Sequence, residues 1–186
     1  RRQLADHPHQ LSGGQRQRVM IAIALSCEPK LLIADEATTA LDVTIQAQIL
    51  ELMKNLTTQL GTALLIIPHN LGVVARYADR LNVMYAGKIR ESGTAEEVYL
   101  GPSHPYTVGL LNSVPRLDRP ASERLDPIEG EIPDPASLPT GCAFHPRCRW
   151  STSKCGLEDP VLERIQDRQM VACFESESVA RATGLT

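Results

Sequence analysis

The chain lacks long hydrophobic runs and a surplus of positive charge. None of its apolar stretches approaches the roughly eighteen residues that a helix needs to span a bilayer. The first residues, Arg1 and Arg2, are not followed by the apolar core of a signal peptide. The formal net charge is −3 and the arginines are scattered rather than gathered in a basic stripe, which argues against a nucleic-acid partner. We therefore expect a cytoplasmic protein whose contact with a membrane goes through partner proteins.

Enough apolar sequence is present for a core. The 186 residues are 42% hydrophobic, which suits one domain or one and a half. The apolar run at 31–34 leads directly into two adjacent carboxylates, Asp35 and Glu36. A buried strand that ends in acids places charge at the carboxyl edge of a parallel sheet, where open α/β folds bind ligands. Taken alone, the stretch fits equally a core strand followed by a solvated turn.

A glycine-rich motif lies upstream of this strand. It consists of Leu11, Ser12, Gly13, Gly14 and Gln15, or LSGGQ. Ser12 can cap a helix that begins in the glycine pair, and the two glycines allow close backbone approach. The start of such a helix offers N–H groups and the positive end of its dipole to an anion. The alternative is an ordinary glycine-rich helix start without a ligand.

Together, LSGGQ, the LLIADE at 31–36 and the Ala40-Leu41-Asp42 that follows resemble the ATPase domain of ATP-binding cassette (ABC) transporters. The resemblance implies an α/β fold, a partial P-loop nucleotidase, with ATP and Mg²⁺ as cofactors. In such a domain Asp35 helps to hold Mg²⁺ and Glu36 polarises the attacking water. Residues 11–15 grip the γ-phosphate of ATP held by a second ATPase subunit, identical or paralogous. Asp42 lies in the loop through which the two subunits communicate.

His69 follows the next expected strand, at 62–67. By itself a loop histidine is more often structural than catalytic, but this one matches the family's switch histidine, which contacts the γ-phosphate and steadies the attacking water. The sequence departs from the family pattern at three positions. Pro68 and Asn70 replace threonine and aspartate beside the histidine, and Ala37 stands where the family has proline. Because proline fixes φ and removes an N–H, we expect the His69 side chain to be oriented slightly differently from the family's switch histidine.

One motif of the family is missing. No G-x-x-x-x-G-K-[ST] loop, which would cradle the phosphates, occurs in the chain, and the first residue is Arg1. We therefore expect the C-terminal portion of a transporter ATPase, which by itself binds and hydrolyses ATP poorly. One alternative is a truncated, non-catalytic partner that supplies only LSGGQ and the tail. Another is a stand-alone metal-binding or redox module.

Helix and strand signals fill the sequence up to residue 99. A helix from Gln15 stops before Pro29, and a second helix, capped by Asp42, ends at Gly61. The second helix carries apolar residues at helical spacing, which we expect in the core: Ile45, Ile49, Leu52, Leu56 and Leu60. Residues 80–85 and 88–92 predict a hairpin, and residues 94–97 a capping box that opens a short helix.

The composition changes near Gly101. Nine of the thirteen prolines lie between Gly101 and Pro146, which excludes a long helix or a central strand there. The segments 104–107, 130–134 and 141–148 resemble the C-terminal extension of the oligopeptide and dipeptide importer ATPases, a branch of the ABC family. This resemblance implies peptide import, with permease subunits and indirectly a peptide-binding protein as partners, at the cytoplasmic face of the inner membrane. We divide the chain into a nucleotide-binding part at 1–93, the extension at 94–176 and a tail at 177–186.

Four of the five cysteines form a group in this extension: Cys142, Cys148, Cys155 and Cys173, spaced C-x5-C-x6-C-x17-C. In a cytosolic protein, clustered cysteines indicate a metal rather than disulfides, and thiolates suit zinc or an iron–sulfur cluster. Some relatives carry a four-iron four-sulfur cluster at matching cysteines, so the resemblance puts this cluster first, zinc second and free thiols third. We expect the metal to be a structural staple rather than a redox centre.

Several neighbours of the cysteines have expected roles. Arg147, Arg149 and Lys154 would offset the negative charge of a thiolate cluster, and His145 is expected to be idle beside four thiolates. The fifth cysteine, Cys27, lies in an apolar stretch and is expected to be a buried packing residue of a helix.

Overall fold

The computed structural model describes residues 6–38, 42–68, 72, 76–113 and 127–183. These residues form two compact units, which meet in the sequence between Tyr77 and Ala78. Helices and strands occur in both units, so the mixed α/β class expected from the sequence is confirmed. Among the described residues, no helix combines the length and apolar character needed to cross a bilayer.

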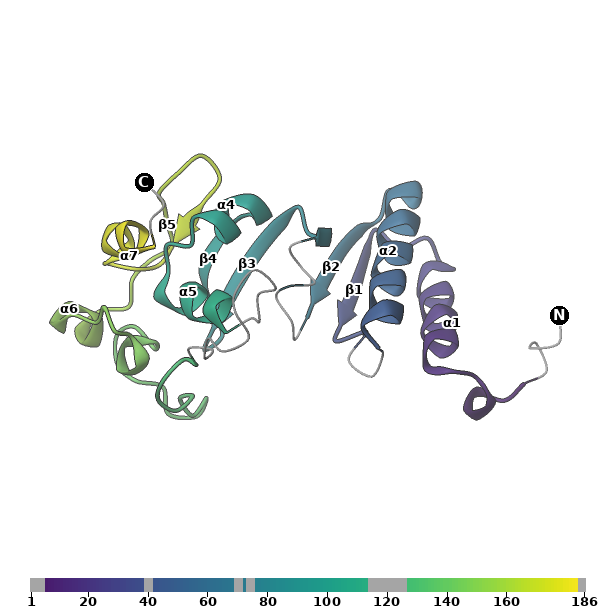
Figure 1. Cartoon of the computed structure of the whole chain (residues 1–186), viewed down its shortest axis with the longest axis horizontal. Helices are drawn as coiled ribbons and strands as arrows, with labels where there is room; N and C mark the ends of the chain where they lie inside the picture. Colours follow the sequence, from purple (N-terminus) through teal and green to yellow (C-terminus); the bar gives the residue numbers. More distant parts are fainter. Residues whose placement is uncertain (1–5, 39–41, 69–71, 73–75, 114–126, 184–186) are drawn as a thin grey trace, which may run out of the picture. The chain divides into compact units, whose positions relative to one another are not determined.

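The first unit is a parallel strand pair with two helices (Figure 1). A short 3-10 helix, Pro8–Gln10, precedes helix α1 (Gly13–Leu25), strand β1 (Leu31–Asp35), helix α2 (Val43–Leu60) and strand β2 (Ala63–Ile67). The register of β1 and β2 runs from Leu31 opposite Ala63 to Asp35 opposite Ile67. Helix α2 is the crossover that two neighbouring parallel strands require.

One hydrophobic cluster holds the two helices against β1. Its buried members are Ile21, Leu25, Ala34, Ile49, Leu50 and Met53. The prediction for α2 is confirmed at Ile49, which is completely buried, and wrong at Leu60, which is 48% exposed because it is the last residue of the helix. Gly61 ends the helix as expected, with the left-handed φ of 65° that glycine adopts without strain.

Two expectations for the first unit are wrong. β1 is not a fully buried strand, because the described residues cover only one face of the strand pair, and Leu31 and Ile33 on the other face are 50% and 57% exposed. Cys27 is exposed rather than packed in a helix. The apolar stretch that suggested a buried cysteine stops too early, since α1 ends at Leu25 and Cys27 lies in the following turn.

The second unit is built on a four-stranded antiparallel sheet in the order β3-β4-β6-β5. Strands β3 (Arg80–Tyr85) and β4 (Lys88–Thr94) form the predicted hairpin, and Ala86 and Gly87 both have positive φ at its turn. The two-residue strands β5 (Glu163–Arg164) and β6 (Met170–Val171) add to β4. The helices are α4 (Ala95–Leu100), α5 (Pro105–Asn112), α6 (Ser153–Leu157) and α7 (Ser176–Ala182), with a 3-10 turn at His145–Arg147.

The proline-rich extension is tied to the hairpin rather than separate from it. Glu91 and Ser92 of β4 pair with Val171 and Met170 of β6. A cluster of aromatic rings joins the same parts, with the Tyr85 ring centroid 4.7 Å from that of Tyr106 and 5.1 Å from that of Phe144. The boundary at residue 93 stays a prediction, while the hairpin packs in one unit with the extension.

Candidate nucleotide and metal sites

The two carboxylates of LLIADE lie where β1 ends. Asp35 is the last residue of the strand, and both acids are exposed. The N–H of Glu36 donates a 2.9 Å hydrogen bond to the carbonyl of Ile67, which continues the pairing of the strands by one residue. Glu36 itself has a φ of 45°, a left-handed conformation that costs a non-glycine residue free energy and that concentrates at functional sites.

A groove brings these acids together with the helix of LSGGQ. Gly13, Arg16 and Gln17 of α1 line it on one side, and Asp35 and Glu36 line it at the end of β1. The groove therefore carries a guanidinium and two carboxylates. Apolar residues of α1 and β1 line the rest of it. Leu11, Ser12, Gln15 and Asp42 are not among its lining residues.

Ser12 and Gln15 form the predicted cap of α1. The Ser12 hydroxyl accepts the N–H of Gln15 at 3.3 Å, and the Gln15 side chain accepts the N–H of Ser12 at 2.9 Å. Within the described part of the chain, the N–H groups of Gly13 and Gly14 have no hydrogen-bond partner, as is usual for the first turn of a helix. They are the groups that can receive an anion at this end of α1.

The second glycine also has a packing role. A Cβ at Gly14 would lie 2.9 Å from Cγ2 of Ile45, so only glycine lets α1 approach the start of α2 so closely. Asp42 caps α2 as predicted, accepting the N–H of Ile45 at 2.9 Å. Its expected role in communication between subunits stays a prediction. His69 and Asn70 lie outside the described residues, so the switch position also stays a prediction.

The four clustered cysteines line a single small pocket of the second unit. Cys142 and Cys148 flank the 3-10 turn, Cys155 belongs to α6, and Cys173 follows β6. The N–H of Cys142 donates to the carbonyl of Cys155 at 2.8 Å, which links two of the loops directly. Segments that are far apart in the sequence therefore present their thiols to one space.

Burial disfavours the thiolate form of three of these cysteines. Burial raises the pKa of Cys148 to about 11 and that of Cys173 to about 12, and it also raises the pKa of Cys142. Charge on the neighbouring cysteines adds to the shift of each, which shows how near the sulfurs are to one another.

Hydrogen-bonding groups beside the sulfurs can stabilise the thiolate forms. The backbone N–H groups of Phe144, Trp150 and Glu175 lower the pKa of the cysteine two residues before each of them. The Thr152 hydroxyl lies 3.3 Å from Sγ of Cys155. All four sulfurs thus have a hydrogen-bonding group beside them, a pattern suited to holding negative charge.

The pocket is not arranged as a ready-made metal site. Among the described residues, no three His, Cys, Asp or Glu side chains converge closely enough to hold a metal ion. The four thiols are nevertheless the donor type that zinc or an iron–sulfur cluster takes.

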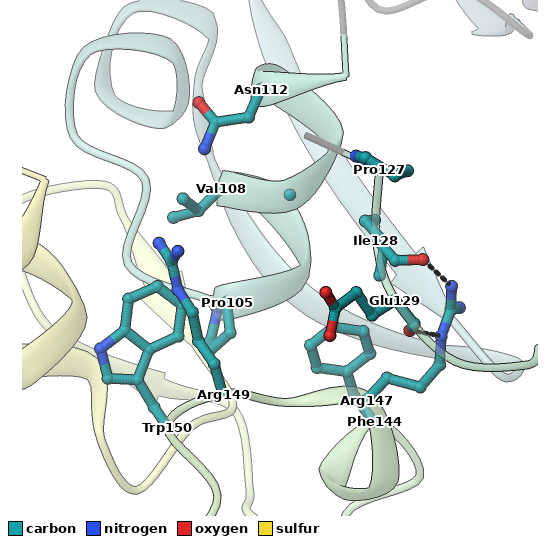
Figure 2. Close-up of a pocket in the computed structure, with 11 residues that line it drawn as sticks. Pro105, Val108, Asn112, Pro127, Ile128, Glu129, Phe144, Arg147, Arg149 and Trp150 are labelled. Carbon is teal, nitrogen blue, oxygen red and sulfur yellow. Dashed lines mark hydrogen bonds between the residues drawn. The ribbon is translucent and has the colours of Figure 1, made fainter. Parts of the chain in front are cut away.

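The basic residues near the cysteines have different partners. Arg147 donates from Nε to the carbonyl of Glu129 and from Nη2 to that of Ile128, both at 3.0 Å (Figure 2). The Arg149 guanidinium lies 4.0 Å from the centre of the Trp150 ring, and its charge lowers the pKa of Cys148. Lys154 lies 4.1 Å from the centre of the Phe174 ring. Charge compensation is thus supported for Arg149, while Arg147 fastens the preceding loop.

His145 is tied to the backbone, with Nδ1 2.9 Å from the carbonyl of Cys142. It therefore holds the loop that carries a cysteine, and its expected lack of a ligand role stays a prediction.

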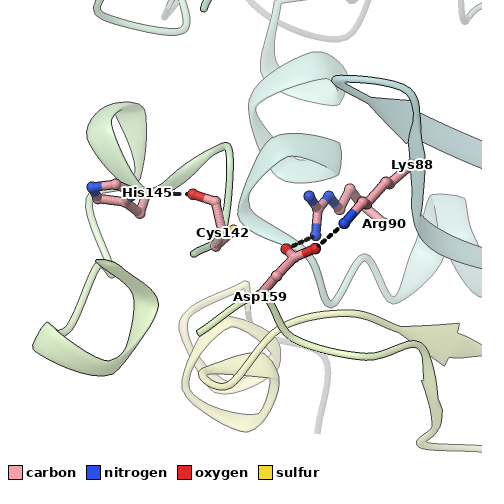
Figure 3. A network of polar contacts seen from close by, with 5 residues as sticks. All are labelled: Lys88, Arg90, Cys142, His145 and Asp159. Atoms are coloured by element: carbon pink, nitrogen blue, oxygen red, sulfur yellow. Dashed lines mark hydrogen bonds and ion pairs between the residues drawn. The ribbon is translucent and has the colours of Figure 1, made fainter. Parts of the chain in front are cut away.

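Sequence reasoning missed an ion pair between a buried arginine and a half-buried aspartate. Arg90 of β4 donates from Nη1 to Asp159 at 2.6 Å, and the exposed Lys88 binds the other oxygen of the same carboxylate at 2.6 Å (Figure 3). Although burial favours the protonated acid, the hydrogen bonds from Lys88 and Arg90 lower the pKa of Asp159. Pro160, the next residue, lines the cysteine pocket.

Sequence reasoning also missed a buried carboxylate that fastens the extension to β4. Glu91 accepts the N–H groups of Ser103 and His104 at 2.7 and 3.1 Å and the Gln169 amide at 2.7 Å. Burial raises its pKa. An isolated arginine or glutamate in a hairpin gives no local signal of such a partner.

Two family models match separate parts of the chain. The model described as "ABC transporter" matches residues 1–39, and the model described as "Oligopeptide/dipeptide transporter, C-terminal region" matches residues 90–155. The first covers LSGGQ and LLIADE, and the second covers three of the four clustered cysteines.

Curated relatives match over nearly the whole chain. The oligopeptide transport ATP-binding protein AppD of Bacillus subtilis is 54% identical over 171 residues, which are 92% of this chain and 52% of AppD. A putative peptide import ATP-binding protein of Brucella ovis is 50% identical over 97% of this chain and 55% of its own length. The oligopeptide transport ATP-binding protein OppD of Salmonella typhimurium is 51% identical over 94% of this chain and 52% of its own length.

Among solved structures, the ATP-binding cassette MJ1267 of an ABC transporter is 34% identical, with a TM-score of 0.49 over 55% of this chain and 40% of that one. The chain spans about half the length of the curated relatives it matches. From its sequence matches, the chain belongs to the ATP-binding proteins of ABC transporters, in their oligopeptide/dipeptide branch.

Proposed function

We propose that the chain is part of an ATPase subunit that powers peptide import by an ABC transporter. The observation that carries this proposal is the pair of exposed carboxylates at the carboxyl end of β1, on one groove with the start of the LSGGQ helix. The names of the relatives, which are oligopeptide transport and peptide import ATP-binding proteins, support the choice of peptide as the transported solute.

We assign to each residue the role that the family resemblance implies. Asp35 helps to hold Mg²⁺ at the strand end, and the metal, when bound, neutralises phosphate charge. Glu36, one residue on, accepts a proton from the attacking water. The N–H groups of Gly13 and Gly14, which bond to no other described residue, receive the γ-phosphate of ATP bound to the opposite subunit. His69 contacts the same phosphate, and Asp42 lies where the two subunits communicate.

The partners follow from this scheme. A second ATPase subunit, identical or paralogous, completes each ATP site, and closure on ATP followed by opening after hydrolysis drives the permease subunits. A peptide-binding protein delivers the peptide to the permeases. The subunit lies peripherally at the cytoplasmic face of the inner membrane.

The test is Glu36→Gln in the complete subunit. We expect hydrolysis to stop while ATP is still bound, so that the ATP-bound dimer accumulates in size-exclusion chromatography. The matched control is Glu51→Gln, which makes the same change on the exposed side of α2 and should hydrolyse ATP at the normal rate. Ordinary turnover by the Glu36 variant would overturn the role.

We further propose that Cys142, Cys148, Cys155 and Cys173 hold a four-iron four-sulfur cluster, with zinc as the alternative. The four thiols on one pocket and the hydrogen-bonding groups beside the sulfurs support a metal, and the resemblance of the extension to the peptide-importer ATPases is the reason for placing the cluster before zinc. Because binding must displace protons from buried thiols, the metal contributes folding free energy to this loop-rich unit.

The test is an anaerobic absorbance spectrum with iron, zinc and sulfide assayed on the same sample. A broad band near roughly 400 nm with about four irons and four sulfides is the expected result. One zinc without colour would replace the cluster by zinc, and no metal after anaerobic reconstitution would overturn the metal centre.

A further inference from the structure

A second pocket of the extension lies beside α5, and none of the residues assigned to ATP or to a metal lines it (Figure 2). Its volume is about 250 Å³, and its walls come from α5, from residues 127–129 and from the stretch between Phe144 and Trp150. Small-molecule sites are typically concave, mostly apolar and equipped with a few polar groups that orient the ligand. This pocket has that composition.

Contacts among the walls hold the pocket open without a ligand. Ile128 lies so close to α5 that a Cβ at Gly109 would be 2.7 Å from Cγ1 of Ile128. Arg147 fastens the same segment by donating to the carbonyls of Ile128 and Glu129. Phe144 is buried and belongs to the aromatic cluster of the unit. The pocket is therefore built by segments that are fixed in place.

Two opposite charges line this space. The Arg149 guanidinium stacks 4.0 Å from the centre of the Trp150 ring, and stacking leaves the N–H donors at its edge for a carboxylate. The Glu129 carboxylate forms no ion pair with a described residue, and in Figure 2 it points toward the side of the pocket that Arg149 and Trp150 line. Neither charge is used up by a neighbour.

This arrangement selects a class of ligand. A guanidinium binds a carboxylate, a carboxylate binds an ammonium group, and Pro105, Val108 and Phe144 offer apolar surface to a side chain. Free amino acids and short peptides carry both charges at neutral pH, since their α-amino and α-carboxyl groups titrate near about 8 and 3.5. Drug-sized ligands take pockets of roughly 300–1,000 Å³, so this smaller pocket suits one or two amino-acid residues.

We propose that the pocket beside α5 binds a small zwitterion of the amino-acid class, either a free amino acid or a dipeptide. Arg149 binds its carboxylate, and Glu129 binds its ammonium group. The proposal goes beyond the proposed function, because it needs neither ATP hydrolysis nor a bound metal.

The test is isothermal titration calorimetry of the complete subunit, without nucleotide, with leucine and with alanyl-leucine as probes. We expect at least one of them to bind with a Kd of about 1 mM or lower, and the tighter one shows whether the site takes an amino acid or a dipeptide. The N-acetylated and the C-amidated form of that probe should each bind about tenfold more weakly, because each lacks one of the two charges.

Variants show which residue meets which end of the probe. Glu129→Gln and Arg149→Gln should each weaken binding about tenfold, and Arg149→Lys should restore most of the loss. Glu129→Gln should no longer distinguish the probe from its N-acetylated form, whereas Arg149→Gln should no longer distinguish it from its C-amide. The matched controls are Glu131→Gln and Arg168→Gln, two exposed positions outside the pocket, which should bind normally.

The crossed pattern separates a ligand contact from a structural effect. A variant that only loosened the pocket would weaken the probe and both modified forms alike, and that result would overturn the assigned contacts. Natural affinity in both Glu129→Gln and Arg149→Gln would place the binding elsewhere and overturn the site. Failure of leucine and alanyl-leucine to bind would overturn the proposal as a whole, while the ATPase role of Glu36 would be unaffected.

Discussion

The N–H of Glu36 donates a hydrogen bond of 2.9 Å to the carbonyl of Ile67, and this bond holds the backbone of Glu36 at a φ of 45°. The chain leaves β1 at this point in a conformation that suits glycine or asparagine better than glutamate. A strained glutamate at the end of the acid-tipped strand is consistent with a residue kept for its carboxylate rather than for stability.

This strain predicts an unusual order of stability at position 36. We expect Glu36→Gly to be more stable than Glu36→Ala by about 1 kcal/mol, because alanine at positive φ keeps the strain and glycine removes it. The comparison of two variants that both lack the side chain isolates the backbone. Urea unfolding followed by far-UV circular dichroism measures the difference.

The control is the same pair of changes at Glu51 on the exposed side of α2, where alanine should be the more stable by about 1 kcal/mol. If Glu36→Ala were also more stable than Glu36→Gly, the positive φ at position 36 would carry no strain.

Gly14 gives a second prediction in the same unit. Gly14→Ala places a methyl group 2.9 Å from Cγ2 of Ile45, so α1 must move away from α2. We expect a loss of about 1–2 kcal/mol, since the overpacking exceeds the gain from alanine's helix propensity. In an Ile45→Ala background the clash is gone, and the same change should become neutral or stabilising. Additive losses in this double-mutant cycle would contradict the contact.

Local signals in the sequence were sufficient for the helix starts and the hairpin. Ser12, Asp42 and Thr94 cap their helices through side-chain bonds to residues three positions on, and such spacing is visible in any sequence. The hairpin of β3 and β4 was equally visible from its turn and its flanking strands.

Long-range relationships were not visible. Nothing local distinguishes Arg90 from an exposed strand arginine, because Asp159 is remote in the sequence and the burial of Arg90 depends on the packed extension. The apolar run of β1 indicated a strand but not which of its faces would be covered. The cysteine spacing indicated a metal site, while the pocket that the four thiols share became visible only in the fold.

The cysteine pocket predicts a contrast between two cysteines. Cys173→Ser should lose most of the bound metal, since a serine hydroxyl is a poor replacement for a thiolate ligand. Cys27→Ser makes the same change at an exposed position of the other unit and should retain the full metal content. Metal analysis after gel filtration measures both. Equal retention by the two variants would remove Cys173 from the proposed ligands.

His104 predicts how the second unit responds to acid. Its side chain caps α5 by accepting the N–H of Tyr106 on Nδ1 at 3.0 Å, and it is almost completely buried. Burial, with a smaller effect of the Arg90 charge, lowers the pKa of His104 to about 3, well below the 6.5 of an unperturbed histidine.

Between these two pKa values the unfolded chain binds a proton that the folded unit does not. Stability should therefore be fully present above about pH 6.5 and should fall on acidification towards about pH 3, by up to about 1.4 kcal/mol per pH unit from this residue. Because Trp150 is the single tryptophan and lies in this unit, its fluorescence in urea titrations from pH 7 to pH 4 reports the unfolding.

His104→Asn keeps a side-chain acceptor for the cap and removes the titrating ring, so its stability should depend less steeply on pH even where its absolute stability is lower. His9→Asn, at an exposed position of the first unit, is the matched control and should leave the slope unchanged. If the natural chain and the His104 variant lost stability in parallel as the pH fell, the acid sensitivity of the unit would have to come from carboxyl groups whose pKa is lowered in the folded state, such as Asp159.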